Sequence, residues 1–413
     1  MDQENILDEV FAHFLKGSRI FKNREVLRHD YVPENLPHRK EQIIRLGEIT
    51  APALKGSPCS NVLIYGKTGT GKTAVVKFVL NKLAQKAKEI GSPVKVCFVN
   101  CRLTGTEYRV LAALCSSINV KVPFTGLAVG EIFDRFKRNL ESQKVIFITA
   151  LDEIDALVKA RGDILLYELT RINENLSKSK VSIIGISNDL KFKEFLDPRV
   201  LSTLSEEEIV FKPYNASELQ DILVERAKIA FYDGVLTEGA VKLCAALAAA
   251  EHGDARRALD LLRVAGEIAE RRGENKITEM HVREAQERIE HDQVYESIKS
   301  LPTHSKIVLL SVYFLNKFNM DRSITGEIYN LYSELCEEFG ISPLTQRRVS
   351  GLINELDVMG LLNSRVISLG RYGRTKKINL GVSRRVVVEV LSEDERFKEI
   401  LNYKPKYLYS PSS

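Results

Sequence analysis

A glycine-rich octapeptide that ends in lysine and threonine carries the clearest chemical signal in the sequence. It follows the apolar run 62–65, and its residues are Gly66, Lys67, Thr68, Gly69, Thr70, Gly71, Lys72 and Thr73. Glycine adopts positive φ readily, so such a loop can turn backbone N–H groups toward phosphate oxygens at the start of a helix. The spacing predicts that the loop binds ATP or ADP, with Lys72 at the β and γ phosphates and the Thr73 hydroxyl on Mg²⁺.

Two adjacent carboxylates, Asp152 and Glu153, follow the mostly apolar run 145–151. A strand that ends in two acids suits phosphoryl transfer, because one carboxylate can complete the Mg²⁺ shell while the other orients the attacking water. We assign Asp152 to the metal and Glu153 to the water. Together with the glycine-rich loop, this pair predicts Mg²⁺-dependent ATP hydrolysis.

The elements that must position these residues alternate between strands and helices. An α/β fold with a parallel sheet is indicated by strand-like runs at 62–65, 94–100, 145–151, 181–186 and 208–212. Beyond Pro213 the pattern becomes wholly helical, at 217–232, 238–250, 254–271 and 280–299, until Leu301 and Pro302 break it. We therefore expect an N-terminal segment with the nucleotide-binding α/β domain over 1–213, a helical lid over 214–300 and a third domain over 301–413.

The third domain shows the pattern of a winged helix. Helices are predicted near 305–318 and 325–339, a third helix opens at Ser342 and Pro343 as N-cap and N1 residues, and two strands flank a tip at 370–374. The third helix would present the side chains that read duplex DNA in the major groove. The predicted DNA contacts of this domain are Thr345, Gln346, Arg347, Arg348, Arg371, Tyr372, Arg374 and Lys376.

Charge is concentrated in the same domain. The whole chain carries a formal net charge of only +5, whereas residues 341–388 contain nine basic side chains and two acidic ones. Such an excess is typical of a surface that binds a polyanion. The alternative is a winged helix that contacts only proteins, with its basic residues as a solvated face.

Composition indicates a multidomain protein without membrane spans. The chain has 413 residues, 44% of them hydrophobic and 28% charged, and no apolar run approaches the ~18 residues of a spanning helix. An acidic N-terminus is unlike a secretory signal, so we expect a cytoplasmic, nucleoid-associated protein. The six cysteines lack paired metal-ligand spacing, and we expect neither zinc nor disulfides.

An ATPase core, a helical lid and a winged helix in this order resemble the archaeal replication initiators of the origin recognition complex and helicase-loader family, which are AAA+ ATPases. The resemblance covers nearly the whole chain. It implies an initiator that binds origin double-stranded DNA, uses weak ATP hydrolysis as a switch, acts with other initiator subunits and helps recruit or load the replicative helicase.

The resemblance also implies roles for residues outside the glycine-rich loop. Segment 28–39 corresponds to the family segment that lies against adenine, with Val32, Pro33 and Arg39 as contacts. The remaining implied nucleotide-site residues are Asn188 as the sensor that orients water, Arg199 as an arginine finger reaching a neighbouring subunit, Arg256 as the second sensor with Arg257 as its alternative, and Tyr214 and Arg226 as contacts from the lid.

A long connection between the second and third strands, 102–144, resembles the initiator-specific insertion that touches DNA in this family. Two helices are predicted at 106–118 and 131–140, and the loop between them would contact DNA through Pro123, Thr125 and Gly126. An ordinary long crossover is the alternative for this connection.

Two other functions share these motifs. A DNA motor or clamp-loading ATPase would use the same site for fast, DNA-stimulated turnover. A transcription regulator could keep ATP as a structural ligand, and removing ATP would then leave its assembly unchanged.

Overall fold

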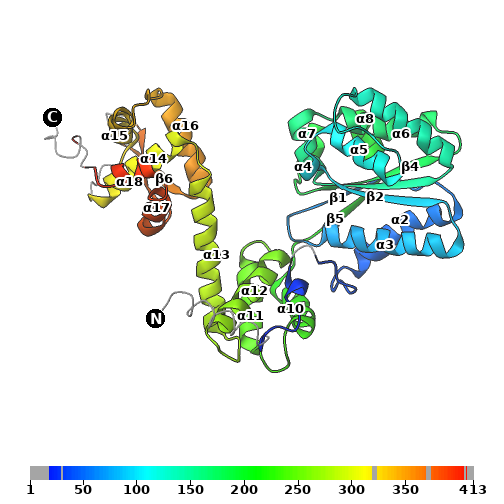
Figure 1. Ribbon diagram of the computed structural model, residues 1–413, viewed down its shortest axis with the longest axis horizontal. Helices are drawn as coiled ribbons and strands as arrows, with labels where there is room; N and C mark the ends of the chain where they lie inside the picture. The colour runs from blue at the N-terminus through cyan, green and yellow to red at the C-terminus, as the bar shows by residue number, and fades with distance from the viewer. Residues whose placement is uncertain (1–17, 29–30, 319–322, 369–373, 404–405, 407–413) are drawn as a thin grey trace, which may run out of the picture. The chain divides into compact units, whose positions relative to one another are not determined.

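The computed structural model describes residues 18–28, 31–318, 323–368, 374–403 and 406 (Figure 1). The chain divides into two compact units, residues 1–285 and 286–413. In the described ranges, no helix combines the length and apolar character needed to cross a membrane.

A five-stranded parallel sheet forms the centre of the first unit, which confirms the predicted α/β fold. Its spatial order is β2-β3-β4-β1-β5. The glycine-rich loop begins at the end of β1, Asp152 ends β3 and Asn188 follows β4. These neighbouring strands therefore bring all three to one edge of the sheet, the usual ligand edge of such folds. The strands are β1 (Val62–Gly66), β2 (Val94–Asn100), β3 (Ile146–Asp152), β4 (Lys180–Ser187) and β5 (Glu207–Phe211).

Helices cover both faces of this sheet (Figure 1). Alternate β1 side chains face opposite ways: Val62 and Ile64 pack with α2 and α3, whereas Leu63 packs on the other side with α5 to α8. The elements of this part are α2 (Lys40–Thr50), η2 (Ala51–Lys55), α3 (Lys72–Ile90), α4 (Cys101–Thr104), α5 (Glu107–Ser117), α6 (Val129–Gln143), α7 (Ile154–Arg161), α8 (Ile164–Arg171), η3 (Ile172–Asn175), η4 (Phe192–Phe195) and α9 (Pro198–Leu204).

Three helices form the lid, and a fourth leaves it. They are α10 (Ala216–Ala230), α11 (Glu238–Ala250), α12 (Ala255–Arg271) and α13 (Glu279–Lys299), the last of which continues into the second unit. Polar N-caps start α10, α11 and α12, because Asn215, Thr237 and Asp254 each accept hydrogen bonds from first-turn amides.

The N-terminal segment 18–28 packs on the lid, although we expected it to belong with the nucleotide-binding domain. The Phe21 and Phe231 rings lie 5.0 Å apart, and the Lys22 amide donates to the Ala230 carbonyl at 2.8 Å. A short helix, η1 (Arg24–Leu27), buries Val26 and Leu27 against the same lid. The chain therefore passes between lid and sheet domain twice, through residues 31–39 and 212–215.

The second unit contains the predicted three helices and hairpin. These are α14 (Thr303–Lys317), α15 (Thr325–Glu338), α16 (Gln346–Val358), and the antiparallel strands β6 (Leu362–Ser368) and β7 (Arg374–Leu380). Two further helices, α17 (Arg384–Leu391) and α18 (Glu395–Ile400), were not predicted from the sequence, and they bury Val387 and Phe397 in the same core.

The start of α16 differs from the prediction. Thr345 is its N-cap residue, and Ser342 and Pro343 precede it in an irregular segment. The Leu344 amide donates to the Tyr332 hydroxyl at 3.1 Å, which holds this segment against α15 instead of in a helix. Thr345 therefore lies at the cap, while Gln346, Arg347 and Arg348 form the first turn.

Candidate nucleotide and DNA sites

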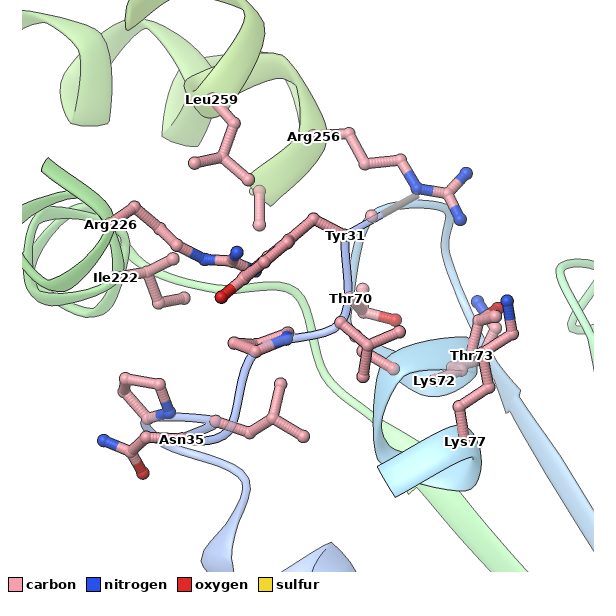
Figure 2. A pocket seen from close by; sticks show the side chains of 18 of the residues that line it. Tyr31, Asn35, Thr70, Lys72, Thr73, Lys77, Ile222, Arg226, Arg256 and Leu259 are labelled. Carbon is pink, nitrogen blue, oxygen red and sulfur yellow. The ribbon is translucent and has the colours of Figure 1, made fainter. Parts of the chain in front are cut away.

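A cavity of about 490 Å³ lies between the ligand edge of the sheet and the lid. Figure 2 shows its two chemically distinct ends. Apolar side chains such as Ile222 and Leu259 line one end, whereas Lys72 and Thr73 line the other. An apolar slot beside a cationic loop matches the two halves of a nucleotide, a flat base and a polyphosphate.

The glycine-rich loop has the backbone that phosphate binding needs. Gly69 and Gly71 adopt φ of +68° and +86°, which favours glycine over residues with a side chain. The Lys72 ammonium is buried and donates to the Gly66 and Lys67 carbonyls at 2.7 and 2.6 Å. Burial lowers its pKa to about 8, against the opposing charge of Asp152. Residues 69–73 line the cavity, whereas Gly66, Lys67 and Thr68 do not.

Thr73 and Asp152 form an oxygen-rich pair that fits Mg²⁺. The Thr73 hydroxyl donates to Asp152 Oδ2 at 3.0 Å. Burial raises the pKa of Asp152, and the Thr73 hydrogen bond counters part of that rise. A hydroxyl and a carboxylate beside the phosphate end are hard ligands of the kind that Mg²⁺ takes.

Glu153 lies beside Asp152 in a left-handed conformation, with φ of +52°. Its carboxylate accepts a hydrogen bond from Asn100 Nδ2 at 3.4 Å and forms an ion pair with Arg102 at 3.5 Å. Neither partner is among the residues predicted from the sequence. A signal for Asn100 existed, because it ends β2 in register with Asp152.

Asn188 lines the cavity, whereas Arg199 does not. The Asn188 backbone N–H donates to Asp155 Oδ1 at 3.2 Å, which fixes the end of β4 to the start of α7. Arg199 is exposed in the first turn of α9, where Asp197 caps the helix. Asn188 therefore belongs to the wall of this cavity, and Arg199 does not.

The lid contributes two arginines to the cavity. Arg256 lines the cavity on the side of Lys72 and Thr73 (Figure 2). Arg257 instead forms an ion pair with Glu251 at 2.9 Å. Arg226 is buried, donates to the Val26 carbonyl at 3.0 Å and lies 4.6 Å from the centre of the Tyr31 ring. Burial lowers the pKa of Arg226.

The segment 31–39 crosses the cavity, and two of its three predicted contact residues line it. Val32 and Pro33 form part of the wall, as does Tyr214 of the lid hinge. Arg39 does not line the cavity, because all its guanidinium nitrogens donate to backbone carbonyls beneath the loop. Arg39 therefore belongs to the segment that we expected to contact adenine, but it does not form part of the cavity wall.

The predicted DNA contacts lie in two places. Thr345, Gln346, Arg347 and Arg348 are all exposed at the start of α16, and Lys376 Nζ donates to Asn354 Oδ1 of that helix at 2.7 Å. Arg371 and Tyr372 lie outside the described residues, and Arg374 begins β7.

In the first unit, the exposed loop between α5 and α6 contains Pro123, Thr125 and Gly126. The Tyr108 hydroxyl donates to the Pro123 carbonyl at 2.6 Å, which ties the loop to α5. Phe124, which is not among the predicted contacts, is 82% exposed at the centre of this loop.

Three family descriptions match the chain in the predicted order. They are an AAA domain over residues 55–191, a Cdc6 AAA+ ATPase-type lid domain over 220–287 and a CDC6 C-terminal winged helix domain over 296–390.

Similar proteins match over almost the full length. The ORC1-type DNA replication protein of Thermococcus onnurineus is 53% identical over 402 residues, with 96% of this chain and 97% of that protein covered. The ORC1-type DNA replication protein 1 of Archaeoglobus fulgidus is 50% identical, with 96% of each covered. The structure of the Aeropyrum pernix ORC1 protein in complex with DNA superimposes with a TM-score of 0.84 at 51% identity and covers 93% of this chain and 100% of that one. The chain therefore belongs to the family of ORC1-type DNA replication proteins, AAA+ ATPases with a Cdc6-type lid and a C-terminal winged helix.

Proposed function

We propose that this protein is an ATP-regulated replication initiator that binds double-stranded DNA at origins. The observation that carries the proposal is the presence, in one chain, of a lidded nucleotide cavity and a winged helix whose reading helix begins with exposed basic residues. Similarity to an ORC1 protein solved with DNA supports it. Its partners would be other initiator subunits and the replicative helicase, with contacts controlled by the nucleotide state.

ATP would bind with its base between residues 31–36 and the lid and its phosphates in the glycine-rich loop. Thr73 and Asp152 would hold Mg²⁺, which supplies charge neutralisation at the phosphates when bound. Lys72 and Arg256 would neutralise further phosphate charge, and Asn188 would help Glu153 orient the water. The Glu153 carboxylate contacts Asn100 at 3.4 Å and Arg102 at 3.5 Å, so it would have to give up or share these contacts to orient water, which supports slow hydrolysis and a switch.

Arg199 would act on the nucleotide of a neighbouring subunit, because it is exposed and away from its own cavity. We expect Arg199→Ala protein to bind ATP with unchanged affinity and to lose hydrolysis in DNA-bound assemblies by about 10³-fold. Mixing it with Glu153→Gln protein should restore turnover, since each variant supplies the group that the other lacks. A large rise in the ATP Kd of Arg199→Ala, or no restored turnover in mixed assemblies, would contradict action in trans.

Genome-wide mapping of the DNA bound in cells tests the proposed function. We expect wild-type protein to concentrate at the sites where replication starts, and Lys72→Ala protein to occupy those sites with altered dependence on the cell cycle. If the protein instead occupies promoters and is absent from the sites where replication starts, it would be a transcription regulator.

A further inference from the structure

Arg39 occupies the point where three segments of the nucleotide-binding unit meet. Its side chain is 4% exposed. Nε donates to the Thr70 carbonyl of the glycine-rich loop at 2.9 Å, Nη2 to the Lys212 carbonyl of the lid hinge at 2.8 Å, and Nη1 to the His38 carbonyl at 2.9 Å. The planar guanidinium has five N–H donors and can bond to acceptors that lie in different directions. A lysine ammonium could not reach all three carbonyls with the same geometry.

Tyr214 packs this guanidinium against the loop. The guanidinium carbon of Arg39 lies 3.7 Å from the centre of the Tyr214 ring, a cation–π contact. The tyrosine hydroxyl reaches Gly71, where an added Cβ would approach it to 2.7 Å. Arg39 and Tyr214 thus fill the space beneath the glycine-rich loop.

The lid also contacts the glycine-rich loop directly. The Ala255 amide at the start of α12 donates to the Gly69 carbonyl at 3.1 Å, and a Cβ at Gly69 would lie 1.7 Å from Asp254 Oδ1. The Tyr214 amide in turn donates to the Gly253 carbonyl at 3.3 Å. Loop, hinge and the lid segment 253–255 therefore form one hydrogen-bonded junction, and Arg256 follows directly after it.

The segment 31–39 reaches this junction from the lid and is attached to α10 on the way. Asn35 Nδ2 donates to Glu225 Oε1 at 2.6 Å, and His38 Nε2 lies 2.9 Å from Asp221 Oδ2. A movement of α10 is therefore transmitted to both connections between lid and sheet domain, and both meet at Arg39.

We propose that Arg39 is a positioning residue that joins the glycine-rich loop to the lid hinge, so that nucleotide bound in the loop sets the position of the lid. It acts through the Thr70 and Lys212 carbonyls and does not touch the nucleotide. The proposal rests on the proposed nucleotide-binding function and adds the connection through which the bound state reaches the lid.

Hydrogen exchange of the full-length protein, with Mg²⁺ and either ADP or a non-hydrolysable ATP analogue, tests this role. In the wild type, nucleotide should slow amide exchange in residues 66–73 and in the lid segment 253–258 together. Arg39→Met keeps the length of the side chain but removes its donors. We expect it to keep nucleotide protection at 66–73, with affinity reduced by about tenfold, and to lose the protection at 253–258.

Two further variants sharpen the test. Arg39→Lys, which keeps the charge but not the fork, should restore the lid response only in part, and it replaces Arg39→Met if that variant fails to fold. Arg45→Met removes an exposed arginine of α2 and should behave as wild type.

The proposal fails if the lid segment of Arg39→Met responds to nucleotide as in the wild type. It fails also if Arg39→Met loses nucleotide as completely as Lys72→Ala, because Arg39 would then be a ligand contact. If nucleotide does not slow amide exchange at 66–73 in the wild-type protein, the proposed function itself is contradicted. The two failures are therefore distinguishable.

Discussion

Lys72→Ala should abolish tight ATP binding, whereas Glu153→Gln should keep ATP bound and stop its hydrolysis. The Lys72 ammonium is buried inside the glycine-rich loop, so its removal deletes a charged contact of the ground state. Hydrogen bonds to charged groups are worth about 1.5–3 kcal/mol each, so we expect the Kd to rise by about 100-fold or more. Glu153→Gln keeps the size of the side chain and removes the base that we propose orients water, so turnover should fall by about 10²–10⁴-fold at similar Kd.

Titration with a fluorescent ATP analogue and a phosphate-release assay separate the two effects. Lys82→Ala is the matched control, because it removes an equal charge from an exposed position of α3 that does not line the cavity. Its Kd should stay within about threefold of the wild-type value. Equal losses of binding in Lys72→Ala and Glu153→Gln would contradict the assigned roles.

The end of the cavity lined by Lys72 and Thr73 could be predicted because its signals are local. The octapeptide contains its own glycines, lysine and threonine, and the acid pair Asp152 and Glu153 directly follows an apolar strand. Strand positions follow from runs of buried residues, and the five predicted strands match the observed ones to within about one residue at each end.

Features that depend on distant contacts could not be predicted in this way. The segment 18–28 belongs with the lid because Phe21 packs on Phe231, and nothing in the local sequence indicates that pairing. Arg39 looks like part of a ligand-contacting segment until its acceptors, Thr70 and Lys212, are seen. The late start of α16 similarly results from the Tyr332 hydroxyl, which competes for the backbone at Leu344.

Replacing Arg347 and Arg348 with alanine should weaken binding to every duplex and also reduce discrimination between origin and random DNA. Both side chains are exposed in the first turn of α16, the position from which reading helices contact bases. Binding with fewer phosphate contacts releases fewer counterions, so the slope of log K against log salt concentration should become shallower by about one to two units. If one arginine makes a bidentate base contact, discrimination should fall by about 1–3 kcal/mol.

Fluorescence anisotropy over a range of salt concentrations, with origin and scrambled duplexes, measures both effects. The double variant Arg371→Ala/Arg374→Ala removes the same charge from the predicted hairpin tip and should lower the salt slope without changing discrimination, because phosphate contacts do not distinguish bases. Arg396→Ala/Lys398→Ala, on exposed positions of α18, controls for net charge alone and should leave discrimination and most of the affinity intact. If the α16 variant and the hairpin variant both bind all duplexes as the wild type does, the basic surface of the second unit does not bind DNA. In that case the winged helix serves protein contacts, and the initiator would have to engage origins through the first unit.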